Sequence, residues 1–258
     1  MRILVTNDDG IDAPGLHALR RIAGEVAGKD GEIWVFAPET NQSGTGHSLS
    51  LNEPLRMRQV DERVYAVRGT PTDSVIMGTR HVLKDGGPDL VLSGVNRGAN
   101  MAEDVTYSGT IAGALEGTQL GIRSMALSLA YGMRSPADNL RWETPIAHAP
   151  GIIRKLLTHE WPEGTLMNIN FPDCLPDEIA ALDVTEQGRR DINPLGVEER
   201  HDTWGTPYYW LGFARRRSNP KEGTDLWSVY NNRISVTPLT LNMTDRATHQ
   251  KLRGSLAL

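Results

Sequence analysis

The chain has 258 residues, 39% hydrophobic and 23% charged, with 27 basic and 32 acidic residues and a formal net charge of −5. This composition is typical of a globular protein and excludes the basic excess of proteins that bind duplex nucleic acid or a membrane surface. A single cysteine, Cys174, excludes an internal disulfide and a thiolate metal cluster. Because no apolar run approaches the ~20 residues that cross a bilayer, and the first run leaves no room for a signal peptide, we expect a cytoplasmic protein with no membrane partner.

The N-terminal stretch predicts a strand, a loop with two carboxylates and a helix. Residues 2–6 are apolar and β-branched, which favours a buried strand, and apolar spacing predicts a helix over 14–28. Between them, Asp8 and Asp9 would repel each other unless a cation lies between them, and Gly10 permits the turn that brings both to one site. One aspartate there would usually cap the helix, but two in succession favour a hard divalent cation.

Strands and helices alternate along the next part of the chain, which indicates an α/β fold with a largely parallel sheet. Right-handed crossovers would place the strand-to-helix loops along one edge of that sheet, where the loops after the first, second and fourth strands converge. An extended piece is also expected from Leu49. Strands are predicted at 32–37, 64–67, 89–94, 125–129 and 166–171, and helices at 69–83, 111–121 and 142–157, the last interrupted by Pro145 and Pro150.

The composition changes from about residue 187, where arginine clusters and aromatic residues appear. Tyr209, Leu211 and Phe213 alternate, which predicts one strand of a hairpin. We divide the chain into a catalytic core over 1–186, a projecting arm over 187–225 and a C-terminal segment over 226–258 that returns to the core or to a neighbouring subunit.

The arm has two interpretations that the pattern alone weighs evenly. An exposed aromatic strand is an association hazard unless it meets a partner, but the arm could also fold back on its own sheet. The clusters Arg189-Arg190 and Arg215-Arg216-Arg217 could contact a nucleotide or a neighbouring subunit, although such runs are usually solvated.

Three loops supply oxygen-bearing side chains for a metal site. The first carries Asp8 and Asp9, the second Asn41 and Ser43, and the third Asn96. Carboxylate, hydroxyl and amide oxygens are hard ligands that suit Mg²⁺ or Mn²⁺.

A phosphate group would need further donors once two carboxylates neutralise a divalent ion. The backbone N–H groups of Ser108, Gly109 and Thr110 open the helix at 111–121 and can bind a phosphate, and the turn at Ser43-Gly44 can add more donors. Simple N-capping is the likelier role of Ser108 taken alone; the position of this segment after the Asn96 loop favours phosphate binding.

Four other candidates have ordinary structural explanations. A lone loop histidine such as His47 is more often structural or at the surface, and Asp73 follows Pro71 in a pattern typical of a helix start. Glu103 and Asp104 are expected to be solvated.

The chain resembles the SurE family (survival protein E), a family of metal-dependent 5′-nucleotidases. The similarity covers nearly the whole chain and is least clear over 189–217 and 250–258. The matching stretches are 3–10 (ILVTNDDG), 13–15 (APG), 37–38 with 41–44 (AP and NQSG), 69–73 (GTPTD), 93–100 (SGVNRGAN), 107–114 (YSGTIAGA), 223–225 (GTD) and 236–239 (VTPL).

The resemblance implies a Rossmann-like three-layer α/β/α core with a C-terminal β-hairpin arm, and one divalent metal ion per subunit. It implies that the metal ligands are Asp8, Asp9, Ser43 and Asn96. It further implies a homodimer or homotetramer with exchanged C-terminal elements, which favours the projecting arm, and activity on nucleoside 5′-monophosphates, with 3′-nucleotides and short polyphosphates as further substrates.

We expect hydrolysis by a metal-positioned water, with Asp8 accepting a proton, or through a covalent aspartyl-phosphate on Asp8. The main alternative is a non-catalytic nucleotide-binding regulatory oligomer, which the same phosphate donors would serve. A dinucleotide-dependent oxidoreductase would need G-x-G-x-x-G after the first strand. A phosphatase of the haloacid dehalogenase type would need D-x-D, whereas the carboxylates here are adjacent.

Overall fold

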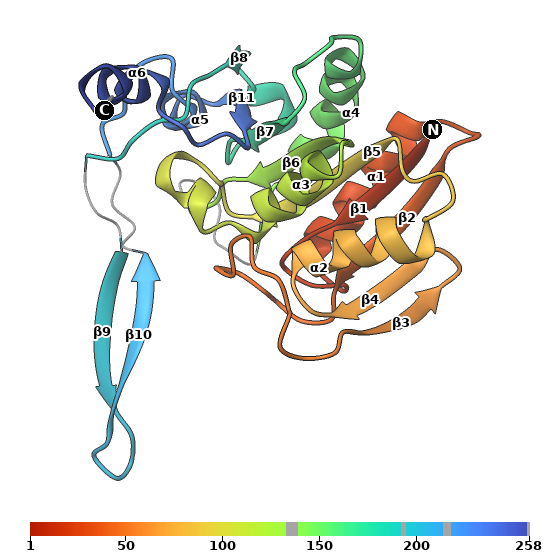
Figure 1. Ribbon diagram of the computed structural model, residues 1–258, viewed down its shortest axis with the longest axis horizontal. Coiled ribbons are helices and arrows are strands. Elements are labelled where there is room, and N and C mark those ends of the chain that lie inside the picture. Colours follow the sequence, from red (N-terminus) through yellow and green to blue (C-terminus); the bar gives the residue numbers. More distant parts are fainter. Residues whose placement is uncertain (133–138, 192–194, 214–217, 257–258) are drawn as a thin grey trace.

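The computed structural model describes residues 1–132, 139–191, 195–213 and 218–256, and its centre is a nine-stranded sheet (Figure 1). The strand order is β3-β4-β2-β1-β5-β6-β7-β11-β8, and the strands from β4 to β7 are parallel. Strands β3 and β11 run antiparallel to β4 and β7. The strands are β1 (Arg2–Thr6), β2 (Glu32–Pro38), β3 (Arg56–Asp61), β4 (Val64–Arg68), β5 (Leu90–Arg97), β6 (Arg123–Leu129), β7 (Thr165–Phe171), β8 (Ala181–Val184) and β11 (Arg233–Thr240).

Helices cover both faces of the sheet, because successive residues of the buried strands point to opposite faces. Ile3 and Val5 pack in the core beneath α1 (Pro14–Ala27) and α4 (Glu143–Leu157). Leu4 packs on the other face with Val75 of α2 (Pro71–Ile76). The remaining helices are α3 (Gly109–Gln119), which packs against α2, and α5 (Asp225–Tyr230), α6 (Arg246–Ser255), a π-helix (Met77–Val82) and 3₁₀ helices at Ala102–Thr106 and Pro176–Glu178.

The order of the strands creates a crevice at the carboxyl ends of β1 and β5. The chain passes from β1 to β2 on one side and later returns to β5 on the other side of β1. In open α/β sheets, ligands bind where the strand order reverses in this way. The three loops named above therefore start at this edge.

The predicted fold class is confirmed: a three-layer α/β/α core with a mostly parallel sheet and a C-terminal hairpin. The fold corrects three details of the prediction. The extended piece expected from Leu49 is not a strand, and β3 begins only at Arg56. Strand β3 was not predicted because it is a largely exposed edge strand without an apolar face. Helix α4 runs unbroken over Glu143–Leu157. Pro145 lies in its first turn, where an amide has no partner within the helix, and Pro150 lies inside the helix without ending it. Strand β5 continues to Arg97, so Asn96 belongs to a strand and not to a loop.

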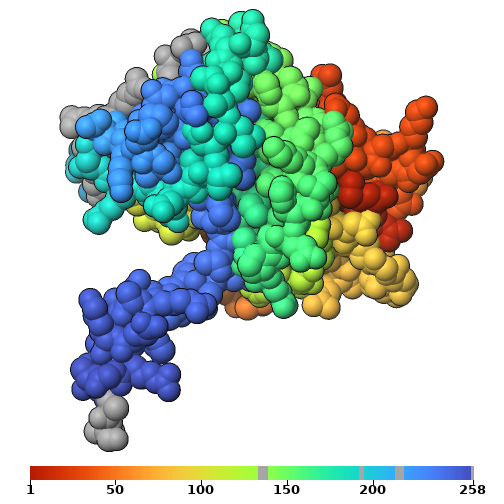
Figure 2. All heavy atoms as spheres, turned by 90° about the horizontal axis from the view of Figure 1, so that it is seen from above, coloured from red at the N-terminus to blue at the C-terminus, as the bar shows by residue number. Residues whose placement is uncertain are grey.

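The arm forms an antiparallel hairpin of β9 (Leu195–His201) and β10 (Pro207–Phe213). It extends away from the core in Figure 1, and the C-terminal residues, dark blue, extend from the body in Figure 2. The arginine cluster at 215–217 lies outside the described residues. Within the described ranges, no helix is both long enough and apolar enough to cross a membrane.

Candidate functional site

Four segments meet at the carboxyl ends of β1 and β5. They are the first loop (residues 7–13), a strap (residues 39–50), the third loop (residues 98–108) and the start of α3. The Gln42 N–H donates to the Asp8 carbonyl at 2.7 Å, and the Gly46 N–H donates to the Tyr107 carbonyl at 3.1 Å. These backbone bonds join the strap to the first and third loops, so the segments form one structure.

Asp8 lies against the start of α3. Its carboxylate is 3% exposed, and Oδ1 accepts a hydrogen bond from Thr110 Oγ1 at 2.5 Å. A Cβ atom on Gly109 would lie 2.7 Å from the Asp8 Cβ and 2.9 Å from Oδ2. Glycine is therefore required at 109 for this carboxylate to approach the helix so closely.

The pKa of Asp8 is raised to about 6. Burial is the largest cause, the Thr110 hydrogen bond acts in the opposite direction, and the charge of Asp9 adds to the rise. A carboxylate with a raised pKa is one whose negative charge is poorly compensated by the surrounding protein. A cation at this position would supply the missing compensation.

Asp9 is half-buried beside the end of β5. Its Oδ2 accepts a hydrogen bond from the Arg97 N–H at 3.1 Å. Burial raises the pKa of Asp9, whereas the Arg97 backbone and charge lower it. Both carboxylates thus carry incompletely compensated charge at one point.

The strap presents Asn41, Ser43 and Gly44 at the surface. The Ser43 N–H donates to Asn41 Oδ1 at 2.8 Å, which closes a side-chain turn. In this structure the Ser43 N–H is therefore used within the strap, and phosphate binding by the Ser43-Gly44 turn stays a prediction. The Ser43 hydroxyl and the Asn41 amide nitrogen remain available as ligand groups.

Asn96 and the start of α3 complete the set. Asn96 Nδ2 donates to the Gly98 carbonyl at 2.8 Å, which leaves its Oδ1 for a ligand. Ser108 Oγ accepts from the Ile111 N–H at 3.0 Å, so its side chain is an N-cap, as the simpler interpretation expected. The N–H groups in the first turn of a helix have no partner within the helix, and here Gly109 and Thr110 carry them.

The predicted residues therefore come together, although their separate roles are not equal. Side-chain contacts join Asp8 to the start of α3 and Asp9 to the end of β5, and the strap is joined to the first and third loops through its backbone. The sequence did not indicate the Thr110 side-chain bond to Asp8, because the two residues are 102 positions apart.

The oxygen atoms of this set suit a hard divalent cation. The described residues hold no group of three or more His, Cys, Asp and Glu that could hold a metal, so a metal here would need hydroxyl and amide ligands as well as two carboxylates. The raised pKa of Asp8 is the observation that fits a cation.

Two residues with a predicted structural role have that role, and one prediction is wrong. Asp73 caps α2 and accepts hydrogen bonds from Thr70 and Ser50, and His47 Nε2 contacts Glu116 Oε2 at 2.9 Å. Asp104 was expected to be solvated, but it forms an ion pair with Arg190 at 2.6 Å.

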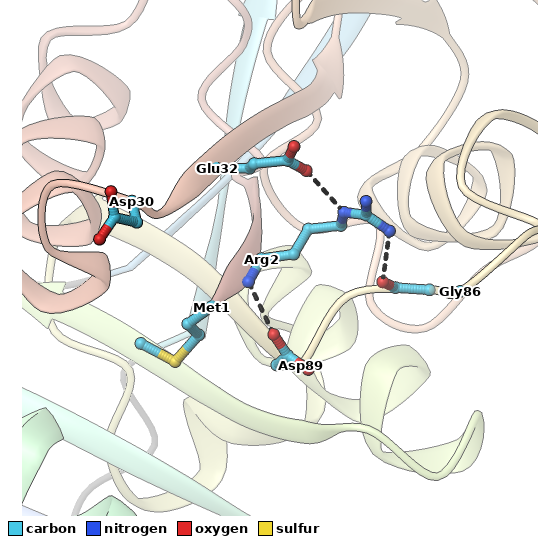
Figure 3. A pocket seen from close by; sticks show the side chains of 7 residues that line it. Met1, Arg2, Asp30, Glu32, Gly86 and Asp89 are labelled. Atoms are coloured by element: carbon cyan, nitrogen blue, oxygen red, sulfur yellow. Dashed lines mark hydrogen bonds and ion pairs between the residues drawn. The ribbon is translucent and has the colours of Figure 1, made fainter.

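A second pocket lies at the opposite end of β1 and does not belong to this site (Figure 3). Arg2 Nε donates to Glu32 at 2.8 Å, and the Arg2 N–H donates to Asp89 at 2.7 Å. The Arg2–Glu32 ion pair and the backbone bond to Asp89 thus use part of the charge that lines this pocket.

Comparison with known proteins identifies the family. The family described as "Survival protein SurE" matches residues 3–194. A protein named 5′-nucleotidase SurE from Parvibaculum lavamentivorans is 55% identical over 256 residues, which cover 99% of this chain and 91% of that protein. A protein of the same name from Methylorubrum populi is 58% identical over 245 residues, 95% of each chain.

A solved structure gives the same result. The crystal structure of the SurE protein from Aquifex aeolicus is 40% identical, covers 100% of both chains and superposes with a TM-score of 0.84. The family match spans well over half of the chain. This chain belongs to the SurE family.

Proposed function

We propose that the chain is a divalent-metal-dependent phosphatase that hydrolyses nucleoside 5′-monophosphates to nucleoside and phosphate. The observation that carries the proposal is the contact of Asp8 with Thr110, which joins a pair of carboxylates to the start of a helix. Two relatives more than half identical to this chain bear the name 5′-nucleotidase, which supports the same activity here.

Asp8, Asp9, Ser43 and Asn96 would hold one Mg²⁺ or Mn²⁺ per subunit. When bound, such an ion polarises the phosphoryl group and lowers the pKa of a water molecule. The chain would bind the phosphate through the Gly109 and Thr110 N–H groups, aided by the Gly44 N–H and the Asn41 amide. The dipole of α3 favours the same negative charge, and Ser108 caps the helix that aims these donors.

In the first of two possible routes, Asp8 accepts a proton from the attacking water. Thr110 fixes the orientation of its carboxylate. Alternatively, the Asp8 carboxylate attacks phosphorus, the bond between phosphorus and the 5′-oxygen breaks and the nucleoside leaves. Water then hydrolyses the aspartyl-phosphate to phosphate and the free carboxylate. Trapping of a phosphoaspartate would decide for the second route.

Phosphate release from a panel of 5′- and 3′-nucleoside monophosphates and short polyphosphates tests the proposal. Each substrate is assayed with Mg²⁺, Mn²⁺ or EDTA, on the wild type and on Asp9→Asn. We expect metal-dependent release from 5′-nucleotides that is lost in the variant. Nucleotide binding without release under either metal would instead support a non-catalytic regulatory oligomer.

We also propose that the protein is a homodimer or homotetramer that assembles through the hairpin arm. An isolated two-stranded hairpin is only marginally stable in water. The hairpin of β9 and β10 also exposes several large apolar side chains. They include Val197 (67% exposed), Trp204 (87%), Trp210 (57%) and Leu211 (70%). The chain has one cysteine, Cys174, and it is buried, which fits a cytoplasmic location.

A further inference from the structure

Both ends of the hairpin arm are attached to the third loop. We call residues 187–190 and 224–225 the hairpin roots, since they precede and follow the hairpin in the chain. They contact residues 101–104, which lead directly to Ser108 and the start of α3. Each root therefore contacts a segment that ends in the candidate active site.

Asp225 forms the centre of the first attachment. Its side chain is 0% exposed, and Oδ2 accepts from the Ala102 N–H at 2.9 Å while Oδ1 accepts from the Gly188 N–H at 2.9 Å. One buried carboxylate therefore joins both roots to the third loop.

Ala102 is the residue that most needs this support. Its φ of +51° lies in the left-handed region, which disfavours residues other than glycine. The Asp225 carboxylate holds its N–H, and Gln187 Nε2 donates to its carbonyl at 2.8 Å. The hairpin roots thus bind both the N–H and the carbonyl of Ala102, whose backbone conformation is energetically unfavourable.

Arg190 forms the second attachment. Its guanidinium is 12% exposed and donates to both carboxylate oxygens of Asp104, at 3.1 and 2.6 Å. Its backbone N–H donates to Glu103 at 3.0 Å. A paired arrangement of this kind is directional and among the stronger polar contacts in proteins.

We propose that Arg190 and Asp225 are positioning residues for the proposed nucleotidase reaction, because from the hairpin roots they hold the third loop and hence the start of α3. The inference rests on the proposed function for its kinetic consequence. The structural consequence, that the third loop becomes more mobile without Arg190 or Asp225, does not depend on the proposed function.

The test uses Arg190→Gln in the full chain, with Arg189→Gln as a matched control. The control removes the same charge from the neighbouring residue, which is exposed. Hydrogen exchange of residues 98–110 is measured on metal-free protein, and kcat and KM are measured with a nucleoside 5′-monophosphate. We expect at least tenfold faster exchange in that segment and a roughly tenfold higher KM with a smaller change in kcat, while the control matches the wild type.

Asp104→Asn provides a second route if Arg190→Gln does not fold, because it weakens the same pair from the other side. Wild-type exchange and kinetics in a folded variant would overturn the proposal. Equal acceleration of exchange across the whole core would also overturn it, since that indicates a purely structural role. A wild-type protein with no phosphatase activity would contradict the proposed function but leave the exchange test standing.

Discussion

Asp8 lowers the stability of the metal-free protein at neutral pH. Its pKa is about 6 in the folded chain against an ordinary value of 3.8, so the folded state binds the proton more tightly than the unfolded state does. Protonation of Asp8 therefore stabilises the folded state. This stabilisation is complete below about pH 4 and is lost as the pH rises through 6. Two pKa units correspond to roughly 3 kcal/mol.

Asp8→Asn should therefore stabilise the metal-free protein while it abolishes turnover, because the amide keeps an acceptor for Thr110 and carries no charge. Urea unfolding in EDTA between pH 4.5 and 7.5 measures the difference between variant and wild type. We expect the variant's advantage to grow with pH, up to about 3 kcal/mol at pH 7. A difference that does not change with pH would show that Asp8 is not the titrating group.

Gly109 determines how closely Asp8 approaches α3. In Gly109→Ala the new Cβ would meet Asp8 at 2.7 Å, so either the carboxylate or the helix start must move. We expect kcat/KM to fall by about 100-fold, the usual effect of a displacement of about 1 Å in an active site. The control is Gly151→Ala in α4, where the new Cβ meets no atom within 4 Å; it should leave activity unchanged and stabilise the helix by up to ~1 kcal/mol. Equal activity of the two variants would contradict the proposed placement of Asp8.

At the scale of elements, the strap depends on one side-chain contact with α3. His47 Nε2 lies 2.9 Å from Glu116 Oε2, and the Glu116 side chain is only 7% exposed. In His47→Ala the strap loses this contact and a buried carboxylate loses its partner, which typically costs 1–3 kcal/mol or more. We expect KM for the nucleotide to rise about tenfold, with partial rescue in His47→Gln, whose amide can still donate.

Steady-state kinetics check this prediction, with His159→Ala as the control because His159 is exposed at the end of α4. If His47→Ala keeps the wild-type KM, the bonds at Gln42, Gly46 and Ser50 hold the strap without His47.

The elements also show what a sequence can and cannot predict. Strand β1 was evident from its short apolar, β-branched run, and helix α1 was evident because its apolar residues recur at helical spacing. Strand β3 was not predicted, because an exposed edge strand needs no apolar face that the sequence pattern would reveal. The acidic loop was evident from two adjacent aspartates, but the Arg190–Asp104 pair was not, since residues 86 positions apart meet only through the fold.

At the scale of the whole molecule, the hairpin is the part that the single chain does not explain. Val197 and Leu211 face each other across β9 and β10, and they are 67% and 70% exposed. Apolar pairs of this kind gain free energy only when another surface covers them. The proposed assembly would cover them with a second copy of the chain.

The double variant Val197→Ser/Leu211→Ser should therefore shift the protein to a smaller assembly while the core stays folded. The chain mass is 28.4 kDa, so light scattering distinguishes a monomer from any multiple of it. Leu51→Ser is the matched control, because Leu51 is 81% exposed but lies outside the hairpin. A wild type that already has the mass of one chain would contradict assembly through the arm. If the wild type is larger than one chain and the double variant has the same mass, the contact between subunits lies elsewhere on the molecule.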